Sequence, residues 1–354
     1  MNLYSSAMAS IVLCIALLMS CSGETPTSST TDQKLETIQA KGGGGGGTTP
    51  NPAIVYSAGV LQKGNTGTYK YYIKVMDADG QNQTSLLEVD GGAEPCWSNT
   101  GSVICYRSAN SNSTVGSIKK FTLGASTNGT PVAGTVTTVF TWSAADSITV
   151  SGHKWSSSAS EIVFTTTQTN QSIAQADRVS TVHVVASTGG TPEEIYSSTD
   201  EYFNRPTWSP DGSSIAVVAR EKSTNETSIK VLNRNSPPEV LADYPGGSPN
   251  NIGYGMEWSR SGSNTLAFFM RPNSSSPFAV YVQEASETSF SPTLAFELPS
   301  DTYTIGGGPS WSPDNSKIVI GWGGIKVITL SSGVLTTLAA NTTSGFASQP
   351  HWKP

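Results

Sequence analysis

Short runs of alternating apolar and polar residues, separated by turn sequences, fill the chain from about residue 52 to its end. One such unit is Pro206–Ala219, with the sequence PTWSPDGSSIAVVA. Pro210 presets φ for a turn, Asp211 can accept a backbone hydrogen bond, and Gly212 tolerates a positive φ. The β-branched run that follows is typical of a strand, so the pattern predicts a hairpin with a Trp on its first strand.

This hairpin recurs along the chain. PSWSPDNSKIVIGW begins at Pro309, EPCWSNTGSVICYRS begins at Glu94, and looser copies begin at Gly152 and Gly255. The Trp residues of the repeat are 58, 53, 50, 53 and 41 residues apart, and they are Trp97, Trp155, Trp208, Trp258, Trp311 and Trp352. Periods of this length with several strands per unit and almost no helical pattern indicate propeller blades.

Each hairpin is followed by further predicted strands. After Trp208 these are Ile215–Ala219, Ser228–Leu232 and Pro238–Leu241. Four short antiparallel strands make a propeller blade, and a single blade must stack on its neighbours to bury its faces. We therefore expect an all-β fold in which the repeated Trp packs where two blades meet.

The two ends of the repeat region complement each other. The segments Ala53–Ala58, Tyr71–Gly80 and Thr84–Val89 supply three strands without a Trp hairpin, whereas Ser348–Pro354 supplies a Trp-bearing strand alone. Together they make one blade. The prediction is a six-bladed propeller of four-stranded blades, closed by pairing of the C-terminal strand with the N-terminal blade.

Three segments resemble the TolB-type six-bladed propeller repeat. They are WSPDG at Trp208–Gly212, WSPDN at Trp311–Asn315 and IKVMDADGQNQTSLL at Ile73–Leu87. The resemblance covers residues 52–354 and implies the fold, not an activity. TolB itself carries an α/β domain before its propeller, whereas about fifty residues typical of a tether precede this one, so we do not expect TolB itself or its partners.

The N-terminal residues predict an export signal and a tether. The apolar run Ile11–Met19 is too short to span a bilayer and suits a signal peptide. It ends in LMSC, which resembles a bacterial lipobox with Cys21 as the lipidated residue. Met19 is bulky for its place and no Lys or Arg precedes the run, so the alternative is an ordinary cleaved signal.

The segment that follows Cys21 is rich in Ser, Thr, Gly and Pro, and it contains six consecutive Gly at Gly42–Gly47. Such a sequence is typical of a flexible linker. We predict a signal peptide at 1–20, a tether at 21–50 and the propeller at 51–354. The expected location is the bacterial cell envelope, lipid-anchored, in the periplasm or at the outer membrane.

Composition narrows the expected partners and chemistry. Charged residues make up 13% of the chain, the net charge is −6, and no basic cluster occurs, which disfavours nucleic-acid binding. Some lyases with TolB-like propellers hold a metal with several His in the channel, but this chain has only His153, His183 and His351. No nucleophile motif accompanies them. We expect no catalytic residues, no metal and no cofactor.

Cys96 and Cys105 flank one turn of the second blade. An exported protein permits a disulfide, and a hairpin of this length can place the two opposite each other. A shift of one residue would put them on opposite faces. Two buried free thiols are the equal alternative.

Residues at the inner edge of the blades vary in chemistry while the Trp stays constant. Lys154, Arg205, Glu257 and His351 are the charged or titratable members that we predict to contact a ligand; the alternative is that they only line a wet channel. The predicted function is a membrane-tethered, monomeric binding or scaffold module for an envelope protein or glycan. The alternative is a lyase- or hydrolase-type enzyme acting on carbohydrate or peptide at the channel.

Overall fold

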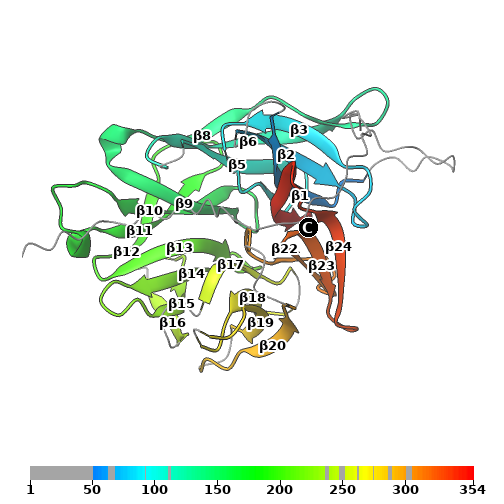
Figure 1. Ribbon diagram of the computed structural model, residues 1–354. Helices are drawn as coiled ribbons and strands as arrows, with labels where there is room; N and C mark the ends of the chain where they lie inside the picture. The colour runs from blue at the N-terminus through cyan, green and yellow to red at the C-terminus, as the bar shows by residue number, and fades with distance from the viewer. Residues whose placement is uncertain are drawn as a thin grey trace, which may run out of the picture. The chain divides into compact units, whose positions relative to one another are not determined.

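The computed structural model describes residues 51–354 apart from 63–67, 92, 111–112, 236–238, 247–251, 261–262, 274, 286–288 and 300–304. Six antiparallel sheets form a ring, which confirms the six-bladed β-propeller (Figure 1). The predicted signal peptide and tether lie outside the described residues. Within the described part of the chain, no helix is long and apolar enough to cross a membrane.

Blades 1 and 3 have the four strands of the predicted repeat, and blade 2 has five. Blade 1 contains, from the inside outward, β25 (Gly345–Trp352), β1 (Ile54–Leu61), β2 (Tyr69–Met76) and β3 (Thr84–Val89). Blade 2 contains β4 (Cys96–Trp97), β5 (Val103–Ala109), β6 (Gly116–Ala125), β7 (Pro131–Ala133) and β8 (Thr137–Trp142). Blade 3 contains β9 (Ile148–Trp155), β10 (Glu161–Gln168), β11 (Ser180–Ala186) and β12 (Glu193–Ser198), with short 3-10 turns at Ala144–Asp146 and Gln175–Asp177.

Blades 4 to 6 repeat the same order. Blade 4 contains β13 (Glu201–Trp208), β14 (Ser214–Glu221), β15 (Thr227–Asn233) and β16 (Val240–Pro245). Blade 5 contains β17 (Ile252–Trp258), β18 (Thr265–Met270), β19 (Ala279–Glu284) and β20 (Thr293–Glu297). Blade 6 contains β21 (Ser310–Trp311), β22 (Lys317–Gly321), β23 (Gly324–Thr329) and β24 (Val334–Ala340).

The predicted fourth strand of blade 4, Pro238–Leu241, lies too early in the sequence. The observed β16 begins at Val240 and runs to Pro245, since Asp243 and Tyr244 continue the pairing with β15. Tyr244 is buried in the junction with blade 5.

The ring closes through the two ends of the propeller. The innermost strand of blade 1 is β25, which pairs antiparallel with β1 from Ile54↔Trp352 to Val60↔Gly345. Figure 1 shows the red C-terminal strand beside the blue β1. The closure predicted from the incomplete first repeat is therefore confirmed.

Blade 2 departs from the four-strand pattern. Its third strand, β6, is ten residues long, and its outer edge pairs with β8 along Gly116–Lys120 and with β7 along Leu123–Ala125. Two short strands thus share the place of one fourth strand. The extra segment accounts for the longest Trp spacing in the sequence, 58 residues between Trp97 and Trp155.

Each of the six repeated Trp residues lies in the apolar cluster between its own blade and the preceding one. Trp258, for example, packs with Val218 and Tyr244 of blade 4 and with Phe268 of blade 5. The other five clusters contain Trp155, Trp208, Trp311, Trp352 and Trp97. This placement confirms that the Trp of the repeat is packing material at the blade junctions. Burying one large side chain stabilises the fold by roughly 2–3 kcal/mol.

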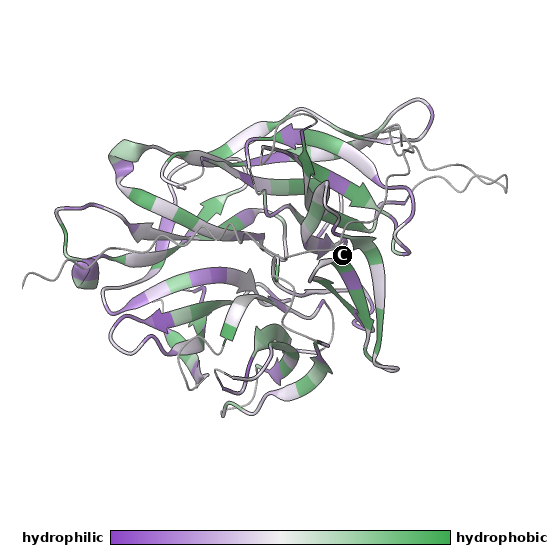
Figure 2. Cartoon of the chain, viewed as in Figure 1, coloured by the Kyte–Doolittle hydropathy of each residue, from purple (hydrophilic) through white to green (hydrophobic). Residues whose placement is uncertain are grey.

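The second strand of blade 5, β18, is the most buried element of that blade. All six residues of β18 are buried, because this strand lies between two strands of its own sheet and between two neighbouring blades. Outer strands such as β24 alternate instead between half-buried and exposed residues. Figure 2 shows hydrophobic and hydrophilic positions alternating along the strands. The apolar core is thus divided among six junctions around the channel.

Candidate functional site

The inner strands share a β-bulge where they line the channel. Pairing registers shift within β9, β13, β17 and β25. In five blades the residue three positions before the Trp has a positive φ, and in blade 6 the residue four positions before it does; these are Glu94, Gly152, Arg205, Gly255, Gln349 and Gly307. Bulges bend a strand and re-aim its side chains. The bulges therefore re-aim the inner strands of blades 1, 3, 4 and 5 where they line the channel.

Glycine occupies the bulge where the neighbouring backbone comes closest. A Cβ on Gly152 would lie 2.9 Å from Cδ of Pro206, and one on Gly307 would lie 2.7 Å from Cα of Gln349. Both residues also have positive φ, which glycine adopts without steric cost. Neighbouring bulges are thus packed against each other around the mouth of the channel.

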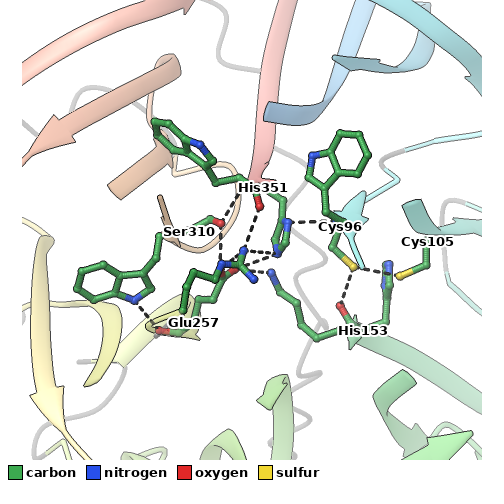
Figure 3. A network of polar contacts seen from close by, with 11 residues as sticks. Cys96, Cys105, His153, Glu257, Ser310 and His351 are labelled. Atoms are coloured by element: carbon green, nitrogen blue, oxygen red, sulfur yellow. Dashed lines mark hydrogen bonds and ion pairs between the residues drawn. The ribbon is translucent and has the colours of Figure 1, made fainter. Parts of the chain in front are cut away.

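Glu257 is the centre of a buried charge network (Figure 3). It is 3% exposed and projects from β17. Its carboxylate oxygens lie 2.8 Å from Nζ of Lys154 on β9 and 2.7 Å from Nη2 of Arg260. The hydroxyl of Ser310, on β21, donates to the same carboxylate over 3.0 Å. Burial alone would raise the pKa of Glu257, but the charges of Arg260 and Lys154 hold it well below its usual value.

His351 joins this network from β25 in blade 1. Its Nδ1 accepts a hydrogen bond from the backbone N–H of Trp97 over 3.1 Å. The neutral ring must then carry its proton on Nε2, which lies 3.2 Å from the carboxylate of Glu257. Burial lowers the pKa of His351 from 6.5 to about 4, and the charge of Lys154 adds to this effect. His351 is therefore neutral at pH 7 and links blades 1, 2 and 5.

A second charge cluster lies at the mouth of the channel. Glu94, ahead of β4, lies 3.1 Å from Arg205 of blade 4 and 3.5 Å from Arg107 of blade 2. Its backbone N–H also donates to the side-chain oxygen of Gln349. Burial opposes ionisation, but the two arginine charges lower the pKa of Glu94 to about 2. Glu94–Arg205 and Lys154–Glu257 thus each join two blades that are not neighbours.

These pairs leave little free space in the channel. One cavity of about 60 Å³ at the mouth is lined by Arg205, Lys154 and His351 among others. Another of about 40 Å³ is lined by Lys154, Glu257 and His351 among others. Each has room for a few waters and not for a sugar ring. The structure thus brings the four predicted contact residues to the channel, where each of them is engaged with another protein residue.

Cys96 and Cys105 are direct partners across β4 and β5. Both are buried free thiols, with their sulfur atoms 3.0 Å apart. Burial and the adjoining Cys96 raise the pKa of Cys105 well above its usual value. Burial acts in the same direction on Cys96, but the hydrogen bond with Cys105 and the imidazole of His153 hold the pKa of Cys96 well below its usual value. The two sulfur atoms are within hydrogen-bond distance, and either thiol can be the donor.

The remaining His residues lie outside the Glu257 network. His153 is buried in β9 and faces the two cysteines (Figure 3). His183, on β11, contacts the hydroxyl of Thr166 and stacks on Phe164.

Sequence reasoning missed Arg260 and Ser310 as partners of Glu257, and His153 as a partner of the cysteines. The repeat signals only that Ser310 immediately precedes its Trp and that Arg260 follows Trp258 by two residues. It does not indicate which residues meet across the axis.

We expect His351 to make the fold sensitive to moderate acid. Its pKa is 6.5 in an unfolded chain and about 4 in the folded one, so the unfolded chain takes up the proton first. Stability that is present above pH 6.5 is therefore lost as the pH falls from 6.5 to 4, by on the order of 3 kcal/mol. Urea unfolding at pH 7, 5 and 4 should show a smaller loss for His351→Gln than for the wild type. Parallel losses in the two proteins would contradict this role.

No family model matches the chain, and none of the curated proteins matches it. Several solved structures do. A TolB-type protein from Agrobacterium tumefaciens is 13% identical, with 86% of this chain and 99% of that chain covered and a TM-score of 0.53. Hydrazine synthase from Kuenenia stuttgartiensis is 11% identical over 86% of this chain and 47% of that chain, with a TM-score of 0.59. A chain of a nidogen/laminin complex is 10% identical over 85% and 98%, with a TM-score of 0.55. Likeness at such identities shows the fold alone, and the chain has the TolB-like six-bladed β-propeller fold.

Proposed function

We propose that this chain is a membrane-tethered propeller of the bacterial cell envelope that binds a protein or glycan partner as a binding or scaffold module. The observation that carries the proposal is the difference in volume between the cavities of the channel and a hollow at the rim. The channel cavities measure about 60 and 40 Å³, whereas a hollow between blades 4 and 5 measures about 790 Å³. Ligand sites commonly have volumes of about 300–1,000 Å³. We place the partner in this hollow, the rim groove.

The rim groove combines hydrogen-bonding groups with apolar surface. Its lining includes Ser209, Asp211, Leu241, Asp243, Trp258 and Asn264. Leu241 is 51% exposed, so it offers an apolar surface to a partner in the groove. Carboxylates and an amide can bond hydroxyl or amide groups of a partner, while Leu241 supplies apolar contact. These features support binding of a polar chain, either a glycan or an extended peptide.

The alternative function, an enzyme acting on carbohydrate or peptide at the channel, has less support. A general acid or base must come within hydrogen-bond reach of the substrate. Glu257 and His351 are each 3% exposed and already paired with Lys154, Arg260 and the backbone of Trp97. A substrate would have to open this network before either group could act on it.

The rim groove can be tested by capture from envelope extract and by glycan arrays, with the full-length protein as bait. Leu241→Arg should weaken partner binding at least about tenfold, a loss of about 1.4 kcal/mol. The matched control is Val334→Arg, because Val334 is 52% exposed on the outer strand β24 and lies away from the groove. It should bind like the wild type.

A channel variant separates the rim groove from the channel site predicted from the sequence. Arg205→Asn removes the cation, and Asn tolerates the positive φ of this position. Binding that persists in Arg205→Asn and fails in Leu241→Arg supports the rim groove. The reverse result would move the partner to the channel mouth.

Lipidation of Cys21 needs a separate test, because Cys21 lies outside the described residues. Lipidation of this residue would hold the propeller at a membrane through the Ser/Thr/Gly-rich segment 22–50. Cys21→Ser should therefore shift the protein from the membrane fraction to the soluble fraction of cells, as followed by immunoblotting. Unchanged membrane retention would count against the lipid anchor.

A further inference from the structure

Three side chains of types that commonly bind metals meet at the junction of blades 2 and 3. Cys96 on β4 and Cys105 on β5 are cross-strand partners, and His153 reaches them from β9. The two sulfur atoms and a ring nitrogen of His153 all lie within 4.8 Å of one another. Figure 3 shows the His153 ring beside the two sulfur atoms. Two thiols and an imidazole are donors typical of zinc sites.

His153 supplies an independent sign of a ligand. It is 3% exposed, and neither of its ring nitrogens has a hydrogen-bond partner among the described residues. A buried polar group without a partner is costly and uncommon in folded proteins. The protein holds this imidazole in an apolar junction that includes Ile118 and Phe164, directly against two thiols. Coordination of a metal would satisfy a ring nitrogen that is otherwise unpaired.

The geometry points to a Zn²⁺ site made by Cys96, Cys105 and His153. Zinc binds sulfur at about 2.3 Å and imidazole nitrogen at about 2.0–2.1 Å, so two tetrahedral sulfur ligands lie about 3.8 Å apart. The sulfur atoms are 3.0 Å apart without the metal, and each needs to move by less than 1 Å. The channel-mouth cavity, which Cys96 and His153 help to line, has room for a water as fourth ligand.

Charge favours a divalent ion over monovalent copper. Two thiolates, a neutral imidazole and Zn²⁺ sum to zero, which suits an apolar junction; Cu⁺ would leave a net negative charge there. Binding releases the protons that the two thiols still carry to solvent and transfers no electron. A disulfide, one of the two alternatives that the sequence left open, is the competing state. It requires an oxidant to take two electrons, it shortens the sulfur separation to about 2.05 Å, and it leaves His153 without a partner.

Cobalt substitution tests the site directly. The untagged full-length protein is reduced, desalted under anaerobic conditions and titrated with Co²⁺. We expect one Co²⁺ per chain, a thiolate-to-cobalt charge-transfer band in the near ultraviolet, and loss of that band when Zn²⁺ is added.

Variants assign the ligands. His153→Gln and Cys96→Ser should each weaken Co²⁺ binding at least about tenfold, a loss reached even by residues that only support a ligand. His183→Gln is the matched control, since His183 lies in the same blade away from the thiols. It should bind Co²⁺ like the wild type.

Two results would overturn the site. One is a reduced wild-type protein that shows no charge-transfer band with Co²⁺. The other is undiminished binding by His153→Gln, which does not depend on whether the cysteine variants fold.

Discussion

The carboxylate of Glu257 is the group on which the centre of this propeller depends. It bonds Lys154 of blade 3, Arg260 of its own blade and Ser310 of blade 6, and it contacts His351 of blade 1. Through His351 the network reaches the backbone of Trp97 in blade 2. A buried charge is tolerated only where such partners surround it. The six apolar junctions hold neighbouring blades together, whereas this one group ties blades across the axis.

The ion pairs in the channel bear on where the protein can bind a ligand. Two ion pairs join non-neighbouring blades in the channel, Lys154 with Glu257 and Arg205 with Glu94. Their charges are already paired, so they are not available to bind a ligand there. A ligand that displaced one partner of such a pair would leave the other charge buried and unpaired, at a cost of several kcal/mol. A partner can bind in the rim groove without breaking the ion pairs of the channel. The charged groups of the channel are already paired with one another, whereas the rim groove has a free volume of about 790 Å³.

Much of the fold could be predicted because the sequence contains a repeated motif. The spacing of Trp97 to Trp352 predicts the blades, and the incomplete first repeat predicts the closure by β25. For the site, the sequence predicted which residues lie at the inner edges of the blades. It did not predict which of these side chains contact each other. Lys154 and Glu257 are 103 residues apart, and no local pattern reveals that side chains of blades 3 and 5 meet in the channel. The meeting of His153 with Cys96 and Cys105 likewise depends on the stacking of two blades, and the bulge that re-aims these strands has no signature beyond scattered Gly and X-Pro pairs.

The free energy of unfolding of Glu257→Gln, measured by urea denaturation at pH 7, tests the central role of this carboxylate. Removing one partner of a buried ion pair leaves the other charges uncompensated, so the account predicts a loss of about 3–5 kcal/mol. Glu88→Gln is the matched control, because Glu88 forms a similar ion pair with Lys70 at 3.0 Å in which both side chains are exposed. It should change stability by less than about 1 kcal/mol. A Glu257→Gln protein that unfolds with the same free energy as Glu88→Gln would contradict the account.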